Sequence, residues 1–308
     1  MRPPGGTGCH PCGQALGAVK RRRKAKIGAH VMAAGLGGRQ AHRPVQRCVY
    51  GRARSVPACG ACGEEFVMAP IGLTPGNDAS GAVQETALRD GFVVCHGRLG
   101  DWARAAAGPS APGLLGADWP RYLATREPAA RARLLGSRLL LRRAVAAVSG
   151  VAPDRVRLGR DGWGRPVVHE PAGLDAGISH TAGVLVVGVA LGRRIGVDVE
   201  ARQRPLLAPG LAERFCHAEE LAELRELPSG ERNARLVRLW TLKEAYAKAL
   251  GVGLAYDFRL LRPRPEPHGE GWVLGRISAE WRLRCDGVER FLVASALGPQ
   301  RQAQQTSQ

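Results

Sequence analysis

The sequence predicts an α+β sandwich in which helices and strands recur in two comparable halves, residues 92–192 and 193–298. Two observations support this prediction. Apolar residues recur with helical spacing in AARARLLGSRLLLRRAVAAVS (129–149) and again from Glu231 through Leu250. The run VLVVGVAL (184–191) is β-branched and apolar, as is typical of a buried strand. Helix and strand patterns therefore occur together along the chain rather than in separate blocks.

The elements can be assigned in order. The helix at 129–149 is expected to end at Gly150, a frequent helix stop, and VRLGRDGWGRPVV predicts two short extended segments around a Gly-rich turn. The strand at 184–191 turns through LGRR into IGVDVE (195–200), and this pair is expected to form a hairpin. Beyond Pro205 the pattern is helical, including AEELAELREL (218–227). Two alternating segments, GWVLGRI (271–277) and RFLVASAL (290–297), predict closing strands.

The two ends of the chain differ from its middle. Residues 1–90 are rich in Gly, Pro and Arg and carry KRRRKAK (20–26), so they are expected to be a disordered extension or a wrongly assigned start. Within them, CHPC (9–12) and CGAC (59–62) leave a zinc site open as an alternative. Residues 299–308 are expected to be a disordered tail. The folded part therefore divides into 91–192 and 193–298.

Composition narrows the class of protein. With 308 residues, 44% hydrophobic and 23% charged, the chain has the make-up of an ordinary soluble globular protein. It contains no apolar run of about 18 residues and no secretory pattern, so a cytoplasmic protein without a membrane span is expected. The net charge of +18 is compatible with nucleic acid, phosphorylated ligands or acidic proteins as partners.

Three acidic residues predict a site. Asp198 and Glu200 alternate along one strand, so both carboxylates face the same side about 7 Å apart, and Gly196 on that side leaves room for a ligand. On the helix LWTLKEAYAKAL (239–250), Glu244 and Lys248 share one face with a tryptophan. Three carboxylates suit Mg²⁺, which prefers oxygen ligands. The alternative is a polar strand face and a surface Glu244–Lys248 ion pair.

The motifs GVDVE (196–200) and W-x-x-KEA-x-x-K (240–248) resemble, in this order and at this spacing, the paired signature of the 4′-phosphopantetheinyl transferase superfamily. The resemblance covers residues 110–298, and the two-halved length is similar to the surfactin-type group. It implies a monomeric pseudo-dimer, each half a small antiparallel sheet packed with helices. It also implies Mg²⁺-dependent transfer of the phosphopantetheine arm of coenzyme A to a serine of an acidic carrier protein, releasing adenosine 3′,5′-bisphosphate.

The same resemblance implies roles for single residues. Asp198, Glu200 and Glu244 correspond to metal ligands, and Glu244 and Lys248 to catalytic groups. Glu220, in RFCHAEEL (214–221), matches the position of a catalytic base. The residues expected at coenzyme A come from ISHT, GWGRP, LLLRRAV and the KEA motif: Ser179, His180, Arg165, Arg142 (with Arg143 as the alternative register) and Lys243.

Two other functions remain open at this stage. A nucleic-acid-binding or zinc-binding module would act through the N-terminal region, and deletion of residues 1–68 would distinguish it from a transferase. A relative that binds coenzyme A without catalysis is the second alternative. The presence of all three carboxylates together with Lys248 argues against that reading.

Overall fold

The computed structural model describes residues 69–77, 79–267, 271–274 and 280–300. Its α-helices are α1 Ser80–Asp90, α2 Leu99–Ala106, α3 Ala111–Leu115, α4 Trp119–Ala124, α5 Pro128–Ser149, α6 Ala218–Glu226 and α7 Ser229–Leu250. Its strands are β1 Ile71–Gly72, β2 Phe92–Arg98, β3 Arg157–Arg160, β4 Pro166–Glu170, β5 Leu174–Thr181, β6 Val184–Leu191, β7 Arg193–Ala201, β8 Arg264–Pro265, β9 Trp272–Val273, β10 Arg282–Val288 and β11 Phe291–Gln300. Short 3₁₀ turns lie at Gly116–Asp118, Pro153–Arg155, Ala212–Arg214, Gly253–Ala255 and Phe258–Leu260.

The two halves repeat one pattern of strand, long helix and hairpin. In the first half, β2 and α5 precede the β5–β6 hairpin, and β6 pairs antiparallel with both β5 and β2. In the second half, β7 and α7 precede the β10–β11 hairpin, and β11 pairs antiparallel with both β10 and β7. Helices α5 and α7 have 22 residues each. The prediction of an α+β fold with two similar halves is confirmed.

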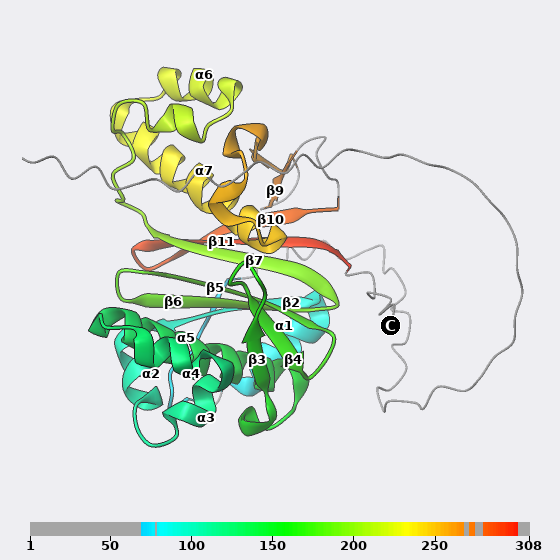
Figure 1. Cartoon of the computed structure of the whole chain (residues 1–308). Helices are drawn as coiled ribbons and strands as arrows, with labels where there is room; N and C mark the ends of the chain where they lie inside the picture. The colour runs from blue at the N-terminus through cyan, green and yellow to red at the C-terminus, as the bar shows by residue number, and fades with distance from the viewer. Residues whose placement is uncertain (1–68, 78, 268–270, 275–279, 301–308) are drawn as a thin grey trace, which may run out of the picture. The chain divides into compact units, whose positions relative to one another are not determined.

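The two sheets lie face to face between α5 on one side and α7 on the other (Figure 1). The first sheet has the order β1-β2-β6-β5 and the second β7-β11-β10-β9-β8, while β3 and β4 form a separate pair. One core fills the space between α5 and the first sheet, another the space between the sheets, and a third the space between α7 and the second sheet. Burying these apolar faces is the main stabilising contribution to such a fold.

The expected hairpin between residues 184–191 and 195–200 does not form. Strand β6 already pairs on one edge with β2 and on the other with β5, so it has no free edge for β7. Gly192, whose φ is 63°, turns the chain out of the first sheet, and β7 pairs with β11 in the second. This correction matters because it places β7 at the edge of its sheet, beside β5.

The folded region begins earlier and ends later than expected. Residues 71–90, assigned to the disordered extension, include β1 and α1, and α1 buries Val83 and Ala87 in the core that α5 also lines. Only two positions of α1 are buried, which explains why its apolar periodicity is weak in the sequence. Strand β11 continues to Gln300, into the expected tail. The basic run and both Cys pairs lie outside the described residues.

Within the described residues, no helix has the length and apolar character needed to cross a bilayer.

Candidate active site

Strand β7 turns its apolar and acidic residues to opposite sides, as its alternating sequence predicts. Ile195, Val197 and Val199 are buried in the core between the two sheets. Asp198 and Glu200 instead meet side chains of α7, which packs on the other face of the strand. The strand therefore delivers two carboxylates to one surface of α7.

Gly196 allows α7 to lie directly against β7. A Cβ atom at this position would stand 2.0 Å from the carbonyl oxygen of Ala245 and 2.4 Å from the amide nitrogen of Ala249. Both are backbone atoms of α7, so the expectation that Gly196 leaves room for a ligand is wrong. The helix backbone fills that space. The glycine thereby fixes the short distance over which side chains of α7 reach Asp198.

One face of α7 meets the carboxylates of β7. Trp240, Glu244 and Lys248 follow one another at intervals of four residues, so they share a side of the helix. Lys248 contacts Asp198, and Trp240 donates a hydrogen bond to Glu200. Glu244 lies on the turn between them. The helix and the strand thus bring together the three acidic residues expected from the sequence.

Asp198 is the buried centre of this group, its side chain only 5% exposed. Its Oδ1 accepts hydrogen bonds from Lys248 Nζ at 2.6 Å and from Ser179 Oγ at 2.8 Å. Ser179 Oγ also lies 3.0 Å from Lys248 Nζ and accepts the N–H of Val199 at 3.3 Å. The second carboxylate oxygen, Oδ2, is buried and has no hydrogen-bond partner among the described residues. A buried acceptor of this kind is costly unless a ligand satisfies it.

Glu200 is held by residues that flank it. Its Oε1 forms an ion pair with Arg204, and the guanidinium of Arg204 lies 4.9 Å from the ring centre of Trp240. Burial and the nearby charge of Asp198 raise the pKa of Glu200, whereas Arg204 and the hydrogen bond from Trp240 oppose the rise. Arg204 therefore neutralises a carboxylate that would otherwise stand beside two others.

Glu244 carries the clearest sign of crowded negative charge. Burial raises the pKa of its carboxyl to about 7, and the charges of Asp198 and Glu200 add to that shift while Lys248 opposes it. The side chain is buried, with 8% exposure. A buried carboxyl whose pKa is raised by two neighbouring carboxylates marks a site that favours a bound cation.

The pKa of Glu244 predicts how stability depends on pH when divalent ions are absent. Because the folded-state pKa of about 7 lies above the ordinary 4.5, the stability contributed by protonated Glu244 is fully present below about pH 4.5. It is lost as the pH rises through about 7. The midpoint of urea unfolding in chelator should therefore fall between about pH 5 and 8, and Mg²⁺ should raise it most at the higher pH. Equal slopes for wild type and Glu244→Gln would contradict this.

The three carboxylates supply the oxygen ligands that Mg²⁺ prefers. In this structure they meet cationic side chains of the chain itself. Among the described residues no three His, Cys, Asp or Glu side chains are already arranged around one ion position. Lys248 holds Asp198, and Arg204 holds Glu200. The unpartnered Oδ2 of Asp198 and the raised pKa of Glu244 are the observations that favour a hard divalent cation there.

Arg142 lies outside this group. Its guanidinium is buried, and Nη1 donates to the carbonyls of Pro153 at 3.1 Å and Val156 at 2.7 Å. Nη2 donates to the carbonyl of Leu114 at 2.8 Å. These acceptors are backbone atoms of the turns around α5, so the side chain joins loops of the first half. Both terminal nitrogens are therefore engaged within the protein, while Nε is buried without a hydrogen-bond partner among the described residues. The expected contact of Arg142 with coenzyme A stays a prediction.

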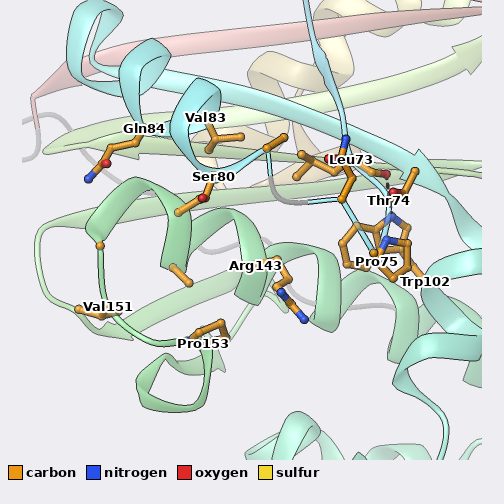
Figure 2. Close-up of a pocket in the computed structure, with 16 residues that line it drawn as sticks. Leu73, Thr74, Pro75, Ser80, Val83, Gln84, Trp102, Arg143, Val151 and Pro153 are labelled. Atoms are coloured by element: carbon orange, nitrogen blue, oxygen red, sulfur yellow. Dashed lines mark hydrogen bonds between the residues drawn. The ribbon is translucent and has the colours of Figure 1, made fainter.

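Arg143, the alternative register, lines a separate cavity of about 470 Å³ between α1, the segment before it, and α5 (Figure 2). Leu73, Val83 and Trp102 contribute apolar walls. None of the acidic residues lines this cavity, so neither arginine of the LLLRRAV segment reaches the acidic group. Arg143 follows Arg142 by one residue and is exposed on the helix, where Arg142 is buried.

Arg165 is also engaged within the protein. Its guanidinium forms a two-pronged ion pair with Asp175 and donates to the carbonyl of Ile195 at 2.7 Å. The Nε donates to the backbone carbonyl of Lys248 at 3.2 Å. A bidentate partner occupies the fork in this structure, and the expected contact of Arg165 with coenzyme phosphate stays a prediction.

Glu220 and Lys243 pair with each other away from the acidic group. Lys243 Nζ lies 2.5 Å from Glu220 Oε2 and 2.9 Å from the carbonyl oxygen of Phe215. The same Oε2 accepts the N–H of His217 and so closes the start of α6. Burial lowers the pKa of Lys243, which the charge of Glu220 opposes. Glu220 is 1% exposed, and its Oε1 has no hydrogen-bond partner among the described residues. The catalytic role of Glu220 and the coenzyme contact of Lys243 stay predictions, and the geometry shows a buried ion pair.

Glu220→Gln tests whether the role of Glu220 is structural. The change leaves the buried Lys243 ammonium without a charged partner, so we expect a loss of about 3 kcal/mol of unfolding free energy. Transfer activity, assayed well below the melting temperature of the variant, should stay within about threefold of wild type. A general base would show a loss of about 10²–10⁴-fold in turnover, and that result would restore Glu220 to a catalytic role.

His180 follows Ser179 on β5 and is exposed beside the acidic group. Partial desolvation of the ring lowers its pKa, as do the positive charges of Arg133 and Lys248, so the imidazole is neutral at pH 7. Arg133, on α5, is half-buried and was not expected from the sequence. Arg133 and Lys248 give the rim of the site a positive potential suited to phosphate, and the neutral imidazole of His180 adds a hydrogen-bonding group beside them.

Sequence reasoning missed three residues around the site: Arg204, Asp175 and Arg133. A signal existed for two of them. Asp175 and Ser179 are four residues apart on one strand and must face the same side. Arg204 follows Glu200 by four residues, just beyond the end of the strand, so it is near enough in the sequence to pair with that carboxylate. Nothing local distinguished Arg133 from the other arginines of its helix.

Comparison with known proteins shows which family the chain belongs to. Residues 194–296 match the model of the 4′-phosphopantetheinyl transferase superfamily. An L-aminoadipate-semialdehyde dehydrogenase-phosphopantetheinyl transferase of Eremothecium gossypii is 30% identical over 216 residues, which cover 68% of this chain and 70% of that protein. The chain belongs to the 4′-phosphopantetheinyl transferase superfamily.

Other relatives match over shorter stretches. The 4′-phosphopantetheinyl transferase HetI of Nostoc sp. is 33% identical over 42% of this chain and 55% of its own length. The 4′-phosphopantetheinyl transferase psf-1 of Bacillus pumilus is 30% identical over 46% and 59%. The chain thus spans little more than half the length of these two. A holo-(acyl-carrier-protein) synthase structure from Bacillus anthracis aligns with 35% of this chain and 96% of its own, at 23% identity and a TM-score of 0.30.

Proposed function

We propose that this chain transfers the 4′-phosphopantetheine arm of coenzyme A to a serine of an apo acyl or peptidyl carrier protein. The observation that carries the proposal is the convergence of Asp198, Glu200 and Glu244 with Lys248 on facing surfaces of β7 and α7. Membership of the superfamily supports the same reaction. The serine oxygen forms a bond to the β-phosphorus of the coenzyme pyrophosphate, and the bond to the α-phosphate oxygen breaks. Adenosine 3′,5′-bisphosphate leaves.

The metal would be held by Asp198, Glu200 and Glu244. When bound, Mg²⁺ would neutralise part of the negative charge of the pyrophosphate. Binding requires the carboxylates to exchange contacts with chain cations for contacts with the ion. Glu244 is the residue whose charge state changes most, because its pKa of about 7 in the ion-free site would fall beside a cation.

Lys248 would supply a positive charge to the leaving phosphate. Its side chain is 33% exposed, whereas that of Asp198 is buried, so Lys248 stands at the boundary between the acidic group and solvent. Ser179 orients it through the 3.0 Å contact to Nζ. His180 and Arg133 border the same surface and would contact coenzyme phosphates. Positioning and charge neutralisation are the main tasks in phosphoryl transfer.

The carrier protein is proposed to be acidic, which would match the net charge of +18. Opposite charges accelerate encounter, and salt screens them. We therefore expect kcat/KM for the carrier to fall roughly tenfold between about 50 and 500 mM NaCl, with turnover at saturating carrier little changed. Stopped assays over a series of salt concentrations check this, and a kcat/KM independent of salt would contradict steering.

Because both halves lie in one chain, a monomer is proposed, to be checked by light scattering.

The reaction is tested by intact-mass spectrometry. Purified full-length protein, coenzyme A and Mg²⁺ are incubated with apo carriers of fatty-acid, polyketide and peptide synthesis and with the carrier domain of an aminoadipate-semialdehyde dehydrogenase. The mass of at least one carrier should increase by one phosphopantetheine, and its Ser→Ala variant should not change. No mass gain on any carrier, with a known transferase active in parallel, would overturn the proposal.

A further inference from the structure

Arg165 and Asp175 form a buried clamp that joins three elements of the site. Arg165 is 9% and Asp175 2% exposed. Arg165 Nη1 donates to Asp175 Oδ1 at 2.7 Å, and Nη2 pairs with Oδ2. The remaining contacts go to the backbone carbonyls of Ile195 on β7 and Lys248 on α7. Four contacts to three acceptor groups leave the guanidinium little freedom to turn toward a ligand.

The turn before Arg165 presets its position. Asp161 Oδ1 accepts the N–H of Trp163 at 2.9 Å and that of Arg165 at 3.0 Å. The carbonyl of Arg165 in turn accepts the N–H of Asp161 at 3.0 Å. This closes the turn between β3 and β4, so the side chain enters the buried space from a backbone that is itself held.

Asp175 extends the clamp along β5. Its Oδ2 accepts the N–H of Ile195 at 2.8 Å, and four residues later Ser179 Oγ accepts the N–H of Val199 at 3.3 Å. The two side chains therefore hold the exposed edge of β7 at points four residues apart. Gly177 lies between them, and a Cβ there would be 3.3 Å from the amide nitrogen of Val197. Strands β5 and β7 are thus fixed in register without a shared ladder.

The third contact fixes the end of α7. The carbonyl of Lys248 is one of the last of the helix, where carbonyls attract cations, and it already accepts the N–H of Gly251 at 3.1 Å. Arg165 Nε adds a second, charged donor from one side, while Lys248 Nζ reaches Asp198 on the other. The backbone and the side chain of Lys248 are therefore both anchored, the first through the clamp and the second through the acidic group.

We propose that Arg165 and Asp175 are positioning residues that hold Lys248, Asp198 and Ser179 in the geometry required for transfer. This inference rests on the proposed function. It differs from the coenzyme-binding role that resemblance assigns to Arg165, because the clamp acts through the backbone of the site and contacts no substrate. Outer partners of catalytic groups are typically needed at the level of about 10- to 100-fold in activity.

The test separates positioning from stability. Arg165→Met and Asp175→Leu each remove one member of a buried ion pair and should lower the melting temperature, whereas the double variant should recover most of it, because apolar pairs replace buried ion pairs well. We expect kcat of the double variant to stay about 10- to 100-fold below wild type, with the KM for coenzyme A changed by less than about threefold. Val145→Ala, in the α5 core and 0% exposed, serves as a control of reduced stability with normal kcat.

Each alternative gives a different result. Recovery of kcat together with the melting temperature would overturn the proposal, as would a rise in the KM for coenzyme A at unchanged kcat, which would indicate direct binding. Amide hydrogen exchange of residues 244–252 provides a reading that needs no activity. In the double variant it should accelerate about tenfold or more relative to wild type and Val145→Ala. Unchanged exchange overturns the clamp even if no carrier is ever modified.

Discussion

Glu244→Ala is expected to abolish transfer while leaving the fold intact. Glu244 is the only acidic residue that α7 contributes beside Asp198 and Glu200 among the described residues, and it reaches them from the opposite surface. Removing it leaves two carboxylates on one strand, both already held by cations. Because loss of an outer partner of a metal site costs about 10- to 100-fold, loss of a direct ligand should lower kcat/KM by more than about 100-fold.

Binding and folding are measured alongside activity. Isothermal titration with Mg²⁺ should show weaker binding to Glu244→Ala than to wild type. Without Mg²⁺ at about pH 8 the variant should unfold at equal or higher urea, because a buried carboxyl with a raised pKa has been removed. The matched control is Glu231→Ala, an exposed residue of the same helix. Normal incorporation of the coenzyme arm by Glu244→Ala would rule out the metal role.

The parts of the fold that the sequence predicted are those specified by local pattern. Helix α5 shows sustained periodicity and ends at Gly150, whose φ is 72°. Strand β6 spans Val184–Leu191 as the apolar run indicates, because a strand paired on both edges and covered on both faces needs no polar residue. Strand β10, with Arg282 and Arg284 in its sequence, gave no such pattern, since much of it is only half-buried.

Partner choice could not be predicted in the same way. Two strands joined by a short turn usually pair, yet β6 and β7 do not, because the free edges of β6 are taken by strands distant in sequence. The same holds for side chains. Arg165 meets a carbonyl 83 residues away, and Lys243 meets Glu220 23 residues away. A sequence motif gives the residue type, but tertiary contacts decide which acceptor each donor meets.

The carboxylates were predictable because their geometry is local. Alternation along β7 places Asp198 and Glu200 on one side, and helical spacing places Glu244 and Lys248 on one face. Only the way in which α7 packs against β7 could not be predicted from these local patterns. Gly196 determines how closely α7 approaches β7. The expectation that it leaves room for a ligand was wrong because the space of a missing side chain can be filled by a ligand or by a neighbouring backbone.

Gly196→Ala is therefore expected to separate α7 from β7. The new methyl group would stand 2.0 Å from a carbonyl oxygen and 2.4 Å from an amide nitrogen, both in the backbone of α7, so no rotamer change can relieve the contact. Overpacking that side chains can absorb costs about 1–3 kcal/mol. A backbone clash should reach or exceed the upper limit, so we expect a loss of at least about 3 kcal/mol in urea unfolding.

The control for this change is Gly81→Ala, in α1, where an added Cβ meets nothing within 4 Å. That substitution should be neutral or stabilise the protein by up to about 1 kcal/mol, because alanine favours the helix. Gly196→Ala should also weaken Mg²⁺ binding in the fraction that stays folded, since the clash pushes the helix that carries Glu244 away from the strand that carries the other two carboxylates. If Gly196→Ala unfolds at the same urea concentration as wild type and binds Mg²⁺ equally well, the close contact of helix and strand does not set the site geometry.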